Sequence, residues 1–198
     1  MAKAKKSRVK IVKVSEEDCS ERVLGLDCSS STVGWGLVGI KDNKPILLSY
    51  GQIKPLKSDH DILTRLKDVF DKIIELCEVL KPTEAAVEDF LLFMKAKSSA
   101  TTIVTLASFN RVICIAALVV GLNVTLYPVQ TIRKLVRIGI KRKETIKKEE
   151  MPDLIKEHLS SDFEFTLNRN GIRSEETEDE SDGIAVAWAR VLEKVDEK

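Results

Sequence analysis

Four acidic side chains stand where short strands end and where a late helix begins. Asp27 closes one short apolar strand, and Glu88 closes another. Asp179 and Asp182 are three residues apart, so at the start of a helix they share one face. Ligands of open α/β sheets gather beyond the carboxyl ends of the strands. These four carboxylates are therefore predicted to converge.

Converging carboxylates repel one another and raise one another's pKa values unless a cation compensates their charge. A ligand set made only of oxygens favours Mg²⁺ or Mn²⁺ over zinc. Two such ions about 4 Å apart can activate a water and stabilise the leaving oxygen in phosphodiester cleavage. The pattern predicts a phosphodiester hydrolase with two Mg²⁺ ions, for which Mn²⁺ substitutes, held by Asp27, Glu88, Asp179 and Asp182.

Each part of this pattern also has a simpler interpretation. A lone acid at a strand end is usually a turn cap, and acids at a helix start complement the helix dipole. Strand alternation points Asp89 to the opposite face from Glu88, which makes Asp89 the weaker candidate. The Ser/Thr turn at 29–32, followed by Gly34 and Gly36, also fits the phosphate loop of the actin and sugar-kinase superfamily. These glycines let the second strand pass close to a ligand or a neighbouring backbone.

The charges are separated along the chain, although the net charge is only +1. The first thirteen residues carry six Lys or Arg, residues 133–148 carry eight against one Glu, and residues 175–182 are mostly acidic. Such blocks suit a polyanion-binding face around an anionic, cation-binding centre. A solvated helix face would have the same composition. The side chains expected to contact phosphates are Arg133, Arg142, Lys143, Lys147 and Lys148.

Length and periodicity predict one α/β domain at 21–198 after a flexible basic arm at 1–20. Strands at 22–28, 33–40 and 45–54 form an antiparallel meander, and strands at 85–89 and 122–127 alternate with helices. The result is a mixed sheet of three antiparallel plus two parallel strands, flanked by helices. The later helices are expected at 98–120, 129–137, 143–159 and 179–192, with a flexible stretch at 160–177.

The cellular setting follows from what the sequence lacks. The apolar run 112–120 is too short to span a bilayer and predicts a buried helix, so no membrane partner is expected. The lysine-rich start has no secretory core. A cytoplasmic protein at the nucleoid or at a viral replication site is expected, with an organelle as the alternative. No small-molecule substrate is expected.

Four motifs in order resemble the RuvC family of Holliday junction resolvases. The first is the strand 23–27 with the turn that leads to Gly34-Trp-Gly36, and the second is Ala86-Val-Glu88 followed by Phe93-Met-Lys95. Tyr127-Pro128 with its basic helix pair is similar to the third region. The segment 179–187 matches the closing Asp-x-x-Asp motif. The kinase alternative needs a second nucleotide-binding lobe, for which this chain is too short.

The resemblance implies an RNase H-like fold, a homodimer, and symmetric Mg²⁺-dependent nicking of four-way DNA junctions. Carried over by position, the four carboxylates bind the metals, Phe93 stacks on junction bases, and Arg133 and Lys143 lie beside the cleaved strand. Lys95 and Lys97 join the DNA-binding set. The loop after Glu88 is about two residues longer than is usual in the family. A nuclease for branched or bubble DNA and a catalytically silent nucleic-acid binding module remain the alternatives.

Overall fold

The computed structural model describes residues 9–11, 19–89 and 99–196. Its centre is one six-stranded sheet with the strand order β1-β4-β3-β2-β5-β6. Strands β2, β3 and β4 form the antiparallel meander, while β5 pairs in parallel with both β2 and β6. The strands are β1 (Val9–Ile11), β2 (Glu21–Cys28), β3 (Val33–Lys41), β4 (Lys44–Ile53), β5 (Glu84–Glu88) and β6 (Asn123–Tyr127).

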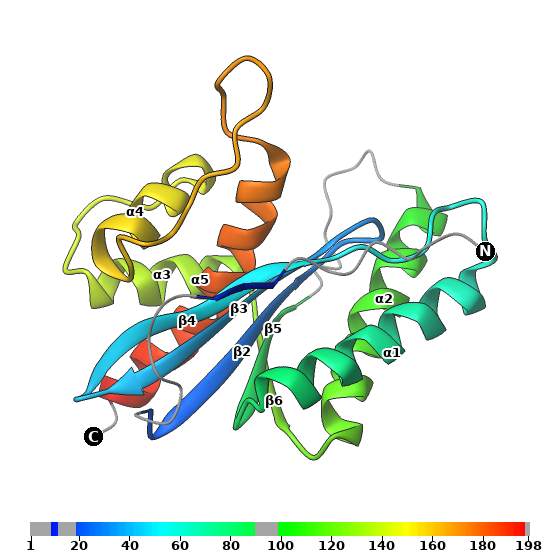
Figure 1. Ribbon diagram of the computed structural model, residues 1–198, viewed down its shortest axis with the longest axis horizontal. Coiled ribbons are helices and arrows are strands. Elements are labelled where there is room, and N and C mark those ends of the chain that lie inside the picture. The colour runs from blue at the N-terminus through cyan, green and yellow to red at the C-terminus, as the bar shows by residue number, and fades with distance from the viewer. Residues whose placement is uncertain (1–8, 12–18, 90–98, 197–198) are drawn as a thin grey trace.

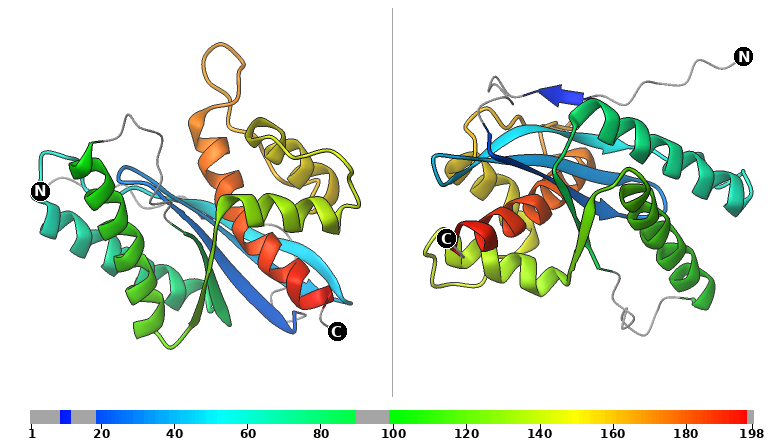
Figure 2. Two further views of the ribbon diagram at one scale, coloured as in Figure 1. Left: turned by 180° about the vertical axis from the view of Figure 1, so that it is seen from behind. Right: turned by 90° about the horizontal axis from the view of Figure 1, so that it is seen from below.

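Helices cover both faces of the sheet, each over its own apolar core. Helices α1 and α2 pack on one face, and α3, α4 and α5 pack on the other (Figures 1 and 2). This arrangement confirms the predicted α/β fold with a mixed, helix-flanked sheet. The helices are α1 (Ile62–Leu80), α2 (Ala100–Val119), α3 (Val129–Gly139), the 3-10 turn η2 (Lys148–Glu150), α4 (Met151–His158) and α5 (Glu175–Asp196).

The sheet has one strand more than the sequence predicted. Strand β1 comes from within the segment expected to be a basic arm, and it pairs antiparallel with β4, with Val9 opposite Gly51. A three-residue strand carries too little periodicity to be recognised from sequence. The division into an arm and a domain stays a prediction, because residues 1–8 and 12–18 lie outside the described residues.

The prediction of a helix at 143–159 was wrong in its first half. Residues 140–147 form turns and irregular backbone, and the α-helix begins only at Met151. Lys141 has a left-handed backbone, with φ of 54°. Pro152 occupies the first turn of α4, where a proline's missing N–H costs no helical hydrogen bond. The Lys and Glu spacing at 143–150 therefore belongs to a loop and to η2.

Helix α2 is not the fully buried helix that the sequence predicted. Phe109 and Ile113 are completely buried, whereas Ile115, Leu118 and Val119 are at least half exposed. By length and composition α2 could cross a membrane. Within the fold, it packs against α1 and its buried side belongs to the core between these helices and the sheet. Its other side leaves an apolar surface open.

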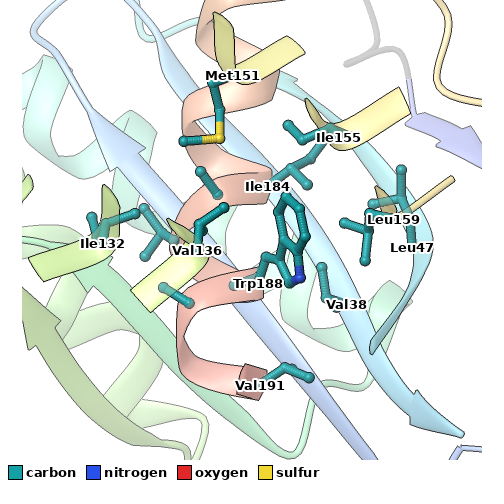
Figure 3. Packing of buried hydrophobic residues seen from close by; sticks show 14 of the residues in the cluster. Val38, Leu47, Ile132, Val136, Met151, Ile155, Leu159, Ile184, Trp188 and Val191 are labelled. Atoms are coloured by element: carbon teal, nitrogen blue, oxygen red, sulfur yellow. The ribbon is translucent and has the colours of Figure 1, made fainter. Parts of the chain in front are cut away.

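Helix α5 lies across the middle of the sheet and holds α3 and α4 in place. Trp188 is fully buried at the centre of this core, among Ile132 and Val136 of α3, Ile155 of α4 and Val38 of β3 (Figure 3). Burying a large aromatic side chain contributes roughly 2–3 kcal/mol. This packing fixes the elements that carry the basic residues relative to the start of α5.

Candidate active site

Two of the four predicted acids stand side by side at the carboxyl ends of parallel strands. Leu26 of β2 pairs with Val87 of β5, so the next residue of each strand, Asp27 and Glu88, lies at the same edge. Glu88 pairs in turn with Tyr127 at the end of β6. The sequence prediction that these two acids share the carboxyl edge of the sheet is confirmed.

The other two acids reach the same edge because α5 touches the sheet backbone. A Cβ atom at Gly34, the partner of Asp27 in β3, would lie 1.8 Å from the carbonyl oxygen of Asp179. A Cβ atom at Gly183 would lie 2.5 Å from the backbone nitrogen of Trp35. Only glycine permits so close an approach of helix and strand. The sequence left open whether Gly34 makes room for a ligand or for a neighbouring backbone, and the structure shows the backbone of α5 there.

Electrostatic coupling shows that the four acids form one cluster. Burial raises the pKa of Asp27 to about 7, with further increases from Asp182 and Asp179. Burial also raises the pKa of Glu88 to about 8, followed by the charges of Asp27 and Asp182. The charge of Asp182 thus destabilises the charged forms of both Asp27 and Glu88. The excess negative charge at this edge attracts a cation.

Lys148 supplies part of the compensating charge. Its ammonium group forms an ion pair of 2.9 Å with Asp182, which remains only 18% exposed. Burial raises the pKa of Asp182, and Lys148 opposes that rise. Burial likewise raises the pKa of Asp179 to about 6. The sequence predicted Lys148 as a DNA contact, and the structure pairs it with one acid of the carboxylate cluster while half of its side chain stays exposed.

Gln52 is a site residue that sequence reasoning missed. Its side-chain amide donates to Asp179 at 3.2 Å and to the carbonyl oxygen of Glu176 at 3.1 Å. It stands at the end of β4, opposite Gly34 in the antiparallel register. A glutamine in a strand gives no signal of this role, because the contact depends on how α5 crosses the sheet. Gln52 fixes the orientation of one predicted metal ligand.

The turn after Asp27 is closed by its own side chains. The Ser29 hydroxyl accepts hydrogen bonds from the backbone N–H groups of Ser31 and Thr32 and donates to the carbonyl of Thr32. The buried guanidinium of Arg65 donates to the carbonyl of Ser30. These bonds use the donors that a phosphate loop would point at its ligand. The turn therefore supports Asp27 structurally.

The predicted basic residues divide between the cluster and its surroundings. The charge of Arg133, in α3, lowers the pKa of both Glu88 and Asp182. Arg142 is held by Glu150 at 2.8 Å. Lys143 and Lys147 are exposed beyond it. Their DNA contacts stay predictions.

Asp89 points away from the cluster, as strand alternation predicted. It forms an ion pair of 3.2 Å with Arg111 of α2, on the other face of the sheet. Phe93, Lys95 and Lys97, predicted as DNA-binding residues, lie outside the described residues.

The donor set suits an oxygen-preferring divalent cation, but its geometry is open. Within residues 9–11, 19–89 and 99–196, no three acidic, histidine or cysteine side chains converge on one point as a metal site. Mg²⁺ usually keeps several waters and takes only one or two protein carboxylates, together with substrate phosphates. A cluster that supplies one or two carboxylates to each ion fits this coordination preference. The fit is thus chemical and electrostatic, without a preformed cage.

With this geometry in place, comparison with known proteins identifies the family. The family model described as crossover junction endodeoxyribonuclease RuvC matches residues 23–162. This chain belongs to the RuvC family. Membership implies a nuclease that depends on divalent metal ions. The match ends before Asp179 and Asp182, whose place in the cluster is given by the packing of α5.

Individual relatives agree with this assignment. The RuvC protein of Fusobacterium nucleatum is 29% identical over 139 residues, which cover 70% of this chain and 68% of that protein. The RuvC protein of Magnetococcus marinus is 24% identical over 173 residues, covering 87% and 85%.

Two solved structures share the fold. Thermus thermophilus RuvC in complex with a Holliday junction substrate has a TM-score of 0.66 at 15% identity, covering 87% of this chain and 94% of that one. The yeast mitochondrial Holliday junction resolvase Ydc2 has a TM-score of 0.58 at 11% identity, covering 90% and 83%. These likenesses confirm the RNase H-like, resolvase-type fold predicted from the sequence motifs.

Proposed function

We propose that this protein is a structure-selective endodeoxyribonuclease that nicks four-way DNA junctions. The observation that carries the proposal is the meeting of Asp27, Glu88, Asp179 and Asp182 at one sheet edge of a RuvC-family fold. Two Mg²⁺ ions, or Mn²⁺ in their place, would activate the attacking water and stabilise the leaving oxygen there.

The chain's own residues set up this chemistry. Asp27 and Glu88 are fixed by the sheet, and Gln52 orients Asp179. Lys148, paired with Asp182, lies where a scissile phosphate would meet a positive charge. Arg133 adds a second positive charge, which acts on Glu88. These positive charges attract DNA to the buried acids, and the phosphate oxygens of the DNA would supply further ligands to the metal ions.

Cleavage of a synthetic four-way junction tests this function. Wild type should nick the junction only when Mg²⁺ or Mn²⁺ is present, whereas Asp27→Asn should bind the junction without cutting it. The matched control is Asp59→Asn, because the side chain of Asp59 is 75% exposed and remote from the cluster in sequence. Fork and plain duplex substrates measure selectivity. Absence of metal-dependent cutting by wild type would refute the proposal.

We also infer a homodimer, which symmetric nicking of a junction requires. The exposed apolar side of α2 is the surface suited to a second copy, because Val104, Ile115, Leu118 and Val119 are 50–65% exposed along one helix. Leu118→Glu should convert the dimer to a monomer in sedimentation equilibrium. Ile138→Glu, on α3 over the opposite face of the sheet, is the control and should remain dimeric. A monomeric wild type would contradict the inference.

A further inference from the structure

A hairpin stands directly before α5, in the stretch that the sequence predicted to be flexible. It spans residues 166–174, with an antiparallel bridge between Leu167 and Arg173. The side chain of Asn168 accepts hydrogen bonds from the backbone of Asn170 and Ile172, which closes the tip. The hairpin projects beyond the rest of the fold, above the start of α5 (Figure 1). It lies outside the residues that match the family model.

The hairpin is tied to the helix that carries two of the catalytic acids. The backbone N–H of Thr166 donates to the Thr177 hydroxyl at 2.7 Å, and that hydroxyl donates to the Thr166 carbonyl at 3.0 Å. Ser174 donates its N–H to the same carbonyl. Thr177 is fully buried and lies two residues before Asp179. The base of the hairpin therefore has a fixed position relative to the carboxylate cluster.

The hairpin is also tied to the segment that carries Lys148. Arg173 donates to the Glu149 carbonyl of η2 at 3.2 Å and to the Asp153 carboxylate of α4 at 2.5 Å. Its guanidinium lies over the Phe165 ring, 4.7 Å from the centroid. Arg173 thus fixes the hairpin to the segment that carries Lys148.

The tip presents a chemistry that suits nucleic acid. Residues 166–174 contain two arginines and no acid. Arg169 is exposed, and it makes no ion pair within the described part of the chain. On either side of it, Leu167 and Ile172 are 55% and 64% exposed. An arginine between two apolar side chains can bind a phosphate while its neighbours pack on sugars or unpaired bases.

We propose that this hairpin is a second DNA-contacting element, with Arg169 binding a backbone phosphate of the junction arm that enters the active site. The inference rests on the proposed function for its substrate. Its base is fixed to the start of α5, and its tip projects from there beyond the rest of the fold. The acids at 175, 176 and 178 belong to α5, so the tip rather than the base meets the DNA.

Binding rather than cleavage is the appropriate test, because binding can be measured whether or not the chain cuts DNA. Arg169→Glu and Lys44→Glu are each placed in an Asp27→Asn background, and their affinities for a fixed four-way junction are measured over a salt series. Lys44 is the matched control because it is the exposed first residue of β4, at the opposite end of the strands from the cluster. Both variants change the net charge equally.

Arg169→Glu should bind the junction about fivefold more weakly than the control, with a slope of log affinity against log salt shallower by about 1. Arg169→Lys should restore most of the affinity. Leu167→Ser combined with Ile172→Ser should weaken binding without changing the salt slope. Equal binding by Arg169→Glu and Lys44→Glu overturns the proposal. Failure of wild type to cleave, with these binding differences intact, refutes only the nuclease function.

Discussion

Replacing Asp27 by asparagine should abolish cleavage and yet stabilise the metal-free protein. Burial and the charges of Asp182 and Asp179 raise the pKa of Asp27 from 3.8 to about 7. The folded state therefore holds a proton that the unfolded state releases as pH rises above about 4, so folding stability falls with pH until about 7 and stays low above it. Asparagine removes this dependence.

The full pKa change corresponds to an upper limit of about 4 kcal/mol. Asparagine keeps the cost of burying a polar group, and Lys148 already offsets part of the repulsion, so we expect a gain of about 2 kcal/mol at pH 8. For a chain of this length that gain raises the melting temperature by about 4–8 °C.

Thermal unfolding in EDTA, at pH 4 and pH 8, measures the effect. Asp27→Asn should melt above wild type at pH 8 and at about the same temperature at pH 4. Added Mg²⁺ should stabilise wild type more than the variant, because an ion binds the folded state through this carboxylate. A variant that melts below wild type at pH 8 would show that Asp27 is held by favourable contacts, and the electrostatic reasoning would be wrong.

Four further substitutions probe the site and the packing around it. Lys148→Met should lower the cleavage rate about 100-fold and move the acidic limb of its pH profile upward, because Lys148 lowers the pKa of Asp27 and Asp182; an unchanged profile would exclude this role. Gly34→Ala should destabilise the fold by about 3 kcal/mol in urea unfolding, since its Cβ would meet the Asp179 backbone. Gly171→Ala, with open space around it and φ of 73°, should cost only about 1 kcal/mol, and equal losses would contradict the packing argument. Arg190→Met should cost about 2 kcal/mol by weakening the pairing of buried Glu84, which Lys194 still contacts, with cleavage at saturating DNA unchanged.

The sheet and two of its acids could be predicted because their signals are local. Short apolar runs bounded by polar turns gave the strands, and strand alternation separated Glu88 from Asp89. The structure confirms both, with Glu88 coupled to the cluster and Asp89 paired with Arg111. These inferences need only the period of a strand and the direction of its chain.

The partners of the acids could not be predicted, because they depend on packing between distant segments. Lys148 reaches Asp182 only because α4 packs on α5, and the local sequence at 143–150 indicated a helix that does not form. The hairpin at 166–174 is polar and lacks a strand period, so the sequence predicted a flexible stretch. Its order comes from hydrogen bonds to Thr177 and from Arg173.

The carboxylate cluster is held together by packing of the backbone and the apolar core. Burial is the main cause of the raised pKa values of Asp27, Asp179 and Asp182, and repulsion from Asp182 raises the pKa of Asp27 and of Asp179 further. What opposes that repulsion is the contact of α5 with the sheet at Gly34 and the core around Trp188. The fold thus stores unfavourable electrostatic energy at one edge, and a cation that binds there gains affinity from relieving it. Binding of the cation therefore requires that Asp179 and Asp182, which follow the residues matched by the family model, keep their positions relative to Asp27 and Glu88.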